Sequence, residues 1–296
     1  MSGRSPIGRS APPPGRRPIA GLSAQRRIRP VRRRSAGMTP VRAGAMLAIL
    51  LSAAAIYGVA NSAAFRLEQV RIEGSTFTDE AAVDAALDDA LGTNLFALRT
   101  GPMEEAIADL PTVARADLRI ALPDAVVVQV EEPEPILIWR IEDDRFLVDA
   151  EGTVFALLGD DPPEAAADLR VVTDRRKASA SMRVGRTLDP VDLDAATRLA
   201  SLTPADVGSE GTRLDVSVTD ANGFMVVGRP ADWRAIFGFY TPSLRTTEII
   251  PGQVRLLRSL LIGREPLIER VVLASETDGT YIPRPTPEPT PTPEPS

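Results

Sequence analysis

The chain has 296 residues, enough for about two domains of ordinary size, and 44% apolar and 25% charged residues are typical of globular proteins. It contains no Cys and no His, which excludes disulfides, thiolate nucleophiles, imidazole bases and the usual zinc and copper ligands. Residues 1–42 hold eleven of the 34 basic residues and no acidic one, so 43–296 carries 23 basic against 40 acidic residues, a net charge of −17. This asymmetry indicates a membrane or a compartment boundary.

The first 42 residues are rich in Arg, Pro, Gly and Ser and lack apolar periodicity, so we predict a disordered arm over 1–42. Residues 43–64 contain no charge, and about 20 apolar residues cross a bilayer as a helix. Because arginines precede this transmembrane helix, we expect the arm in the cytoplasm and the bulk of the chain outside. The alternative is a signal peptide cleaved at 60–64, against which the long leader argues. No aromatic residue is interleaved in the arm for base stacking, so we expect no nucleic-acid partner.

Residues 65–134 are predicted to form a small module that begins with a strand and a helix. The alternating segment 66–74 predicts the strand. Residues 75–92 predict the helix, with Thr78 as its N-cap and Gly92 as its C-terminal cap.

A second helix is expected after Thr100, and two strands are expected on either side of a Leu-Pro-Asp turn, over 113–121 and 125–132. The order is therefore β-α-α-β-β. Leu95 and Phe96 are expected to fill the core beneath the two helices.

Short motifs follow one another through this module and beyond it. They are Val-x-Ile-x-Gly at 70–74, Gly-x-Asn-Leu-Phe at 92–96, Leu-Pro-x-Val-x-x-Ala at 110–116, Leu-Pro at 122–123 and Leu-Val-Asp-x-x-Gly at 147–152. In this order, after a membrane anchor, the motifs resemble the POTRA domain of the FtsQ/DivIB cell-division family. The resemblance implies that a β domain follows the POTRA domain.

Residues 135–282 are predicted to form that second, strand-rich domain with packed helices, which makes the whole fold α+β. The predicted elements are strands near 136–141, 145–148, 153–158, 168–174, 212–219 and 224–227, helices from Pro190 and over 254–261, and terminal strands within 268–282. Across 159–265 the resemblance is weaker, and 229–253 is longer than the corresponding link in the family. The tail 283–296 has Pro at every odd position, which predicts an extended spacer.

The segment DWRAIFGFYTPSLR at 232–245 is unusually aromatic for this chain. The spacing i, i+3, i+4, i+7 holds for Trp233, Ile236, Phe237 and Tyr240. This spacing predicts one face of a short helix. Two interpretations stay open: a core helix on the sheet, or a docking surface that includes Phe239.

Sequence motifs of the common enzyme classes are absent, including G-x-S-x-G, Walker, Rossmann and H-E-x-x-H patterns. A Ser–Lys dyad would need Lys177 with Ser179 or Ser181, in a polar loop. We therefore expect no enzyme, no catalytic residue, no cofactor, no metal and no small-molecule substrate.

The resemblance implies a non-catalytic, single-pass scaffold of the divisome, in the cell membrane at the septum, that gathers FtsB-like and FtsL-like proteins. In the family the last strands of the β domain bind partners, and a sheet edge can do so by strand addition. The matching segments here are 270–275 and 280–282, with candidate contacts at Arg270, Val272, Ala274, Ser275 and Tyr281. The alternatives are an edge covered by the chain's own tail, and a membrane-anchored POTRA receptor or transport-associated protein that binds envelope polypeptides.

Overall fold

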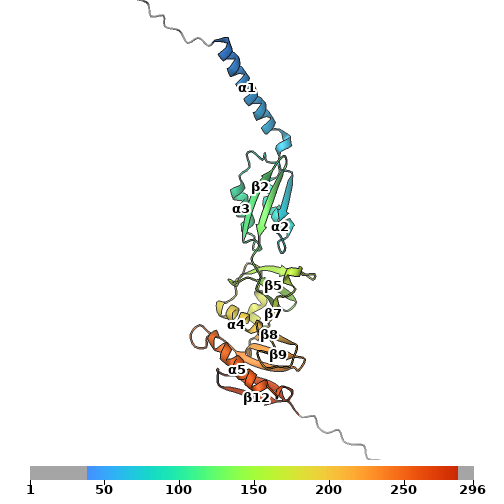
Figure 1. Cartoon of the computed structure of the whole chain (residues 1–296), viewed down its shortest axis with the longest axis vertical. Coiled ribbons are helices and arrows are strands. Elements are labelled where there is room, and N and C mark those ends of the chain that lie inside the picture. The colour runs from blue at the N-terminus through green and yellow to red at the C-terminus, as the bar shows by residue number, and fades with distance from the viewer. Residues whose placement is uncertain (1–38, 286–296) are drawn as a thin grey trace, which may run out of the picture. The chain divides into compact units, whose positions relative to one another are not determined.

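The computed structural model describes residues 39–285, which form one apolar helix followed by two sheets with packed helices (Figure 1). This arrangement confirms the predicted α+β class. Most of the predicted arm, 1–38, and most of the predicted tail, 286–296, lie outside the described residues.

Helix α1 spans Pro40–Ala60 and has no buried residue. At about 1.5 Å per residue, its 21 residues match the thickness of a hydrocarbon layer. Within the described part of the chain it is the one helix long and apolar enough to cross a membrane. The single apolar N-terminal helix is therefore present as predicted, at Pro40–Ala60 where the sequence indicated 43–64, and its insertion in a membrane stays a prediction.

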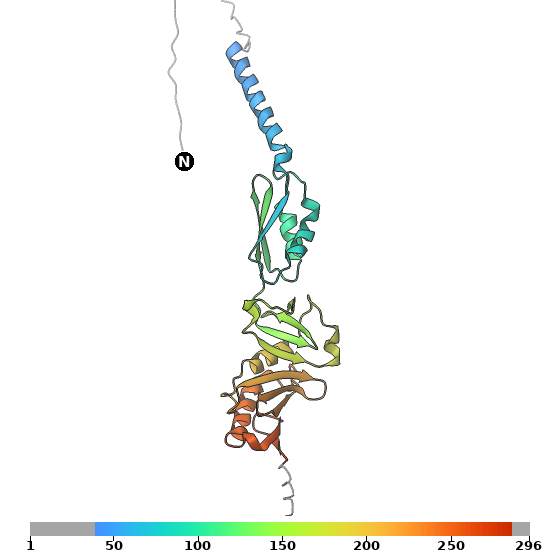
Figure 2. The same ribbon diagram turned by 90° about the vertical axis from the view of Figure 1, so that its right-hand side faces the viewer.

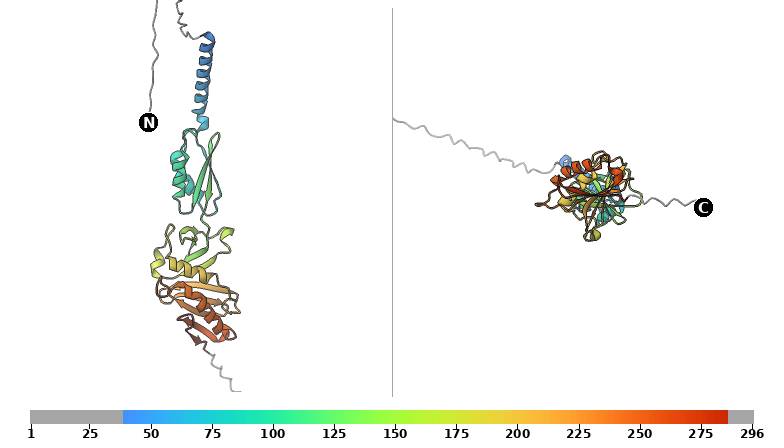
Figure 3. Two further views of the ribbon diagram at one scale, coloured as in Figure 1. Left: turned by 60° about the vertical axis from the view of Figure 1, so that its left-hand side comes forward. Right: turned by 90° about the horizontal axis from the view of Figure 1, so that it is seen from below.

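The first sheet has three strands in the order β1-β3-β2. Its strands are β1 (Gln69–Glu73), β2 (Arg115–Ala121) and β3 (Ala125–Glu131). Strand β3 is central, parallel to β1 and antiparallel to β2. Helices α2 (Glu80–Leu87) and α3 (Thr100–Ala108) cover one face of this sheet (Figure 3). The order β-α-α-β-β is confirmed.

Two details of the module differ from the prediction. The N-cap of α2 is Asp79, whose carboxylate accepts a hydrogen bond from the N–H of Ala81, and not Thr78. The Thr78 hydroxyl instead donates to the C=O of Thr112. Leu95 is buried as expected, whereas Phe96 is 59% exposed and lies against the ring of Phe65, with the two ring centres 5.1 Å apart.

The second sheet has nine strands in the order β12-β11-β10-β9-β8-β7-β4-β5-β6. They are β4 (Leu137–Ile141), β5 (Asp144–Val148), β6 (Val154–Leu158), β7 (Arg170–Asp174), β8 (Arg213–Thr219), β9 (Gly223–Arg229), β10 (Trp233–Gly238), β11 (Ile268–Leu273) and β12 (Gly279–Pro283). Most neighbours are antiparallel, but β4 with β7, β7 with β8, and β10 with β11 are parallel. The predicted strand-rich region is thus confirmed.

Helices α4 (Pro190–Ala200) and α5 (Ile250–Leu261) pack on one face of the second sheet (Figure 2). The predicted cap of α4 is present, because the carboxylate of Asp189 accepts a hydrogen bond from the N–H of Val191. Short 3₁₀ helices occupy the connections η1 (Ala63–Phe65), η2 (Asp88–Ala90), η3 (Glu164–Ala166), η4 (Lys177–Ser181), η5 (Thr247–Ile249) and η6 (Glu265–Leu267). The core between helices and sheet is dominated by large side chains such as Trp139 and Phe224, each of which contributes about 1.5–3 kcal/mol when buried.

The predicted short helix within 232–245 is wrong, because this segment begins with strand β10. Residues four apart share a side in a helix and also in a strand, so the spacing of Trp233 and Phe237 does not distinguish the two. Pairing with β9 and β11 on either side selects the strand. Trp233, Ala235 and Phe237 alternate into the core and are fully buried. At least these three side chains are therefore core.

Candidate functional site

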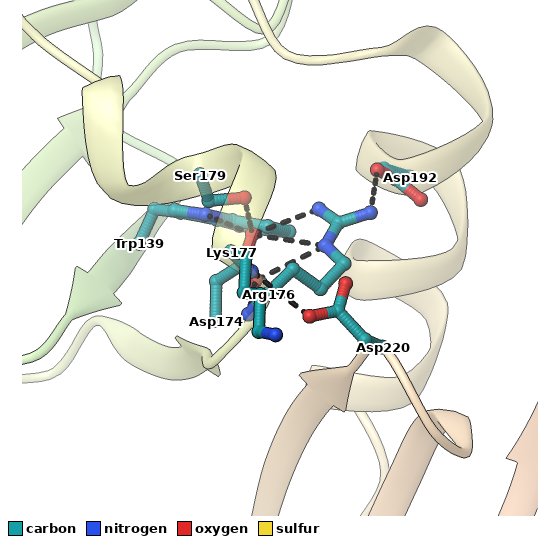
Figure 4. A network of polar contacts seen from close by, with 7 residues as sticks. All are labelled: Trp139, Asp174, Arg176, Lys177, Ser179, Asp192 and Asp220. Carbon is teal, nitrogen blue, oxygen red and sulfur yellow. Dashed lines mark hydrogen bonds and ion pairs between the residues drawn. The ribbon is translucent and has the colours of Figure 1, made fainter.

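A polar network joins the second sheet to α4 (Figure 4). The carboxylate of Asp174 is buried and accepts hydrogen bonds from Nε1 of Trp139 at 3.2 Å and from Oγ of Ser179 at 2.6 Å. Nη2 of Arg176 donates to the same carboxylate at 2.8 Å, and its Nη1 donates to Asp192 of α4 at 2.6 Å. The network therefore cross-links β4, β7, η4 and α4.

The network has the character of a structural clamp. Burial raises the pKa of Asp174, but hydrogen bonds from Arg176 and Ser179 outweigh burial and hold the pKa below its ordinary value. The hydroxyl of Ser179 is committed to Asp174, and Lys177 is exposed. Among the described residues no hydrogen bond joins Lys177 to Ser179 or Ser181, so the geometry of a Ser–Lys dyad is not formed there.

The face of the second sheet away from α4 and α5 carries a shallow arginine-lined hollow. Its arginines are Arg140, Arg170, Arg175, Arg213, Arg229 and Arg234. Asp215 forms ion pairs at 2.9 Å with two of them, Arg213 and Arg229. A cluster of guanidinium groups of this kind can bind carboxylate or phosphate groups.

Strand β12 forms one end of the nine-stranded sheet, and all of its residues are exposed. The C=O of Asp278 accepts a hydrogen bond from Ala274, and the N–H of Arg284 donates to Leu267, so even-numbered residues of this strand bond to β11. Because successive residues of a strand alternate, the odd-numbered residues point their backbone groups away from the sheet. The free edge therefore offers the N–H groups of Gly279 and Tyr281.

The outward-facing N–H donors of this edge end at a proline on the C-terminal side. Pro283 has the same parity as Gly279 and Tyr281 and has no N–H to donate. The sequence continues with Pro at each odd position to 295, which is the signal in the sequence that could have identified the outward-facing positions. Prolines at an edge discourage indiscriminate pairing with other strands.

Two of the predicted contacts, Arg270 and Val272, lie on β11. Strand β11 is paired on both sides, with β10 and with β12, so its backbone is not free for strand addition. Their side chains point away from α5, because the intervening residues Val271 and Leu273 are buried in the core on the α5 side. Arg270 and Val272 can therefore contact a partner only through their side chains.

The other predicted contacts lie around the same end of the sheet. Tyr281 is on β12, 46% exposed, and pairs with the buried Val271, so its side chain lies on the opposite face from Arg270. Ala274 and Ser275 begin the turn between β11 and β12. Phe239 follows β10 and is 51% exposed. The structure thus brings these residues to one end of the sheet but not onto a single face.

Comparison with known proteins finds similarity to a family of POTRA domains and to cell division proteins. The family described as "POTRA domain, FtsQ-type" matches residues 65–132. The cell division protein FtsQ of Rickettsia typhi is 33% identical over 97 residues, which are 33% of this chain and 36% of that protein. The cell division protein FtsQ of Chloroflexus aurantiacus is 28% identical over 244 residues, which are 80% of this chain and 76% of that protein.

The two alignments with FtsQ proteins cover different lengths. The alignment with the Rickettsia protein spans about a third of each chain, close to the length of the POTRA module. The alignment with the Chloroflexus protein covers 80% of this chain and therefore extends beyond the POTRA module. The resemblance indicated by the motifs is confirmed: this chain is related to the FtsQ/DivIB cell-division proteins and carries their type of POTRA domain.

Proposed function

We propose that this chain is a non-catalytic, single-pass scaffold of the bacterial division machinery that acts at the septum. The FtsQ-type POTRA domain and the similarity to FtsQ proteins support a role in cell division. Helix α1 supports a membrane anchor, and the arginines of 1–42 support a cytoplasmic N-terminus with the bulk of the chain outside. In this proposal 65–134 and 135–282 are the POTRA and β domains, and 283–296 is a spacer.

The exposed outer edge of β12 is the observation that carries the proposed binding mode. A partner segment that lies beside β12 as an extra strand would satisfy the outward N–H and C=O groups of Gly279 and Tyr281. The proposed partners are FtsB-like and FtsL-like membrane-anchored proteins, as the family resemblance implies. The proposed side-chain contacts are Arg270, Val272, Ala274, Ser275, Tyr281 and Phe239.

Truncation within the last strand tests this binding mode. A chain that ends at Asp278 lacks β12 and keeps β11, whereas a chain that ends at Pro285 keeps both strands and loses only the tail. Both are co-expressed with tagged FtsB-like and FtsL-like proteins and recovered from detergent-solubilised membranes. We expect the chain ending at Pro285 to bind like the full chain and the chain ending at Asp278 to lose its partners. Equal recovery with both truncated chains would refute strand addition at β12.

A further inference from the structure

Two side chains bridge the ends of β10 and β11 at the point where their backbone pairing stops. The parallel ladder ends at the pair of Ile236 and Val272. Beyond it, the C=O groups of Phe237 and Leu273 each accept two hydrogen bonds from side chains. The donors are Nη2 of Arg245, at 2.6 and 2.7 Å, and Nε2 of Gln253, at 3.2 and 3.1 Å.

The position of Arg245 is determined by backbone carbonyls. Its Nη1 donates to the C=O of Ala274 at 2.8 Å, which gives the guanidinium three carbonyl acceptors. Its Nε is buried and has no hydrogen-bond partner among residues 39–285. Among the ion pairs of the described residues, none includes this arginine. A guanidinium placed in this way serves to hold several carbonyls in a fixed geometry.

Tyr240 connects the two bridging side chains. Its hydroxyl donates to Oε1 of Gln253 at 2.8 Å, and its ring centre lies 5.9 Å from the guanidinium carbon of Arg245. Gln253 is completely buried, so both of its amide donors and its acceptor are used inside the protein. Buried polar networks that are satisfied in this way rigidify the elements they join.

The element held by this network is the chain reversal that leads into β12. Leu273 ends β11, and Ala274 begins the turn over 274–278, which closes through the C=O of Asp278. The start of α5 packs on the same turn, because a Cβ added at Gly252 would lie 2.3 Å from the Glu276 side chain. The reversal is therefore held by Arg245 from one side and by α5 from another.

Strand β12 needs such a support. All of its residues are exposed, so it buries little apolar surface that could keep it in place. A two-stranded hairpin on its own is marginal in water, and edge strands belong to the least protected parts of a sheet. The order of β12 therefore depends on how firmly its preceding turn is fixed.

We propose that Arg245 and Gln253 are positioning residues for β12, which fix the turn 274–278 so that the free edge presents its backbone groups in one register. The claim that an ordered β12 edge binds a partner rests on the proposed function. The claim that Arg245 and Gln253 order this edge is independent of the proposed function and is measured separately.

Hydrogen–deuterium exchange on the full chain in detergent micelles tests the ordering step. The Arg245→Met variant loses all three carbonyl contacts, and we expect peptides covering 268–283 to exchange about tenfold faster, while peptides covering 137–174 stay unchanged. Arg245→Lys keeps the charge but replaces the planar fork with a single ammonium, so an intermediate rate is expected. Tyr240→Phe removes one hydrogen bond and should give a smaller increase. Arg264→Gln, at an exposed arginine, is the control and should exchange like the wild type.

Two results would overturn the proposal. One is protection of 268–283 in the Arg245→Met variant that stays within about twofold of the wild type. The other is a loss of protection that spreads through the whole second sheet in both the Arg245→Met and Arg245→Lys variants, which would show a general structural role.

Partner recovery with the same variants separates this proposal from the proposed function. We expect Arg245→Met to recover less FtsB-like partner than Arg264→Gln. Faster exchange with full recovery would contradict positioning for binding while leaving strand addition intact. Full recovery by the chain ending at Asp278 would instead refute strand addition at β12 and leave the exchange result standing.

Discussion

Replacement of Tyr281 by proline tests strand addition at one donor group. The N–H of Tyr281 points away from β11, because the hydrogen bonds of Asp278 and Arg284 fix which residues of the strand face inward. Tyr281→Pro removes this outward donor and leaves the bonds between β11 and β12 in place. Proline is tolerated on an edge strand when its missing N–H would face solvent, and the residue before it is already extended.

The expected loss of binding affinity comes from the backbone C=O of the partner that would pair with this N–H. A partner C=O that is buried against β12 and left without a donor costs about 1–3 kcal/mol. Since about 1.4 kcal/mol corresponds to a tenfold change in Kd, the variant should bind about 5-fold to 150-fold more weakly. The free energy of unfolding should change by less than about 1 kcal/mol, because Tyr281 is half exposed and its N–H points away from the strands that the structure describes.

Titration of the purified chain in detergent micelles with an FtsB-like partner measures this loss. Tyr281→Ala is the matched control, because it removes the same ring and keeps the N–H. We expect Tyr281→Pro to bind more weakly than Tyr281→Ala by the factor given above. If the two variants bind with affinities within about twofold of each other, the backbone donor is unused and strand addition at this edge is wrong.

Further predictions concern the core, the polar network around Asp174 and the membrane anchor. Phe237→Ala should lower the free energy of unfolding in urea by about 3–5 kcal/mol, whereas Phe239→Ala should change it by less than about 0.5 kcal/mol and weaken partner recovery. Asp174→Asn removes the buried carboxylate from the Arg176 guanidinium, which keeps its ion pair with Asp192, so the variant should cost less at pH 7 than the penalty of about 3–5 kcal/mol for a buried charge left wholly unpaired. Hydrogen bonds hold the pKa of Asp174 below its unfolded value of about 3.9 despite burial, so its stabilisation is complete above that pH and is lost as the pH falls through the folded pKa. Unfolding in urea at several pH values should show a larger acid loss of stability in the wild type than in Asp174→Asn, in which Asp194 and Glu265 still have lowered pKa values. Immunoblots should show an uncleaved chain, and a mature form starting near Phe65 would contradict the anchor.

The POTRA module could be predicted because its signals are local. Gly74 has φ of 85° and Gly92 has φ of 76°, a backbone region that favours glycine, and both mark element ends in the sequence. The sequence does not show which of two adjacent residues caps helix α2, because Thr78 and Asp79 both suit an N-cap. In the fold the carboxylate of Glu132, far along the chain, accepts a hydrogen bond from the N–H of Thr78, and Asp79 is the cap.

The candidate site depends on contacts that no local pattern contains. The aromatic spacing at 233–240 fits a helix, and only the strands on either side of β10 show that it is wrong. Arginine in a loop is usually solvated, so nothing in the sequence singles out Arg245, whose acceptors lie on two distant strands. The pairing with β11 determines that the N–H of Tyr281 faces outward, and the sequence hints at this only through the prolines at odd positions from 283 onward.

Localisation in dividing cells tests the central claim most directly. A fluorescent protein fused to the N-terminal arm reports where the full chain accumulates while septa form. The proposed divisome role predicts a band at the septum, and the same fusion ending at Asp278 shows whether β12 contributes to it. Uniform fluorescence along the membrane of dividing cells, with a functional fusion of the full chain, would contradict a role in division.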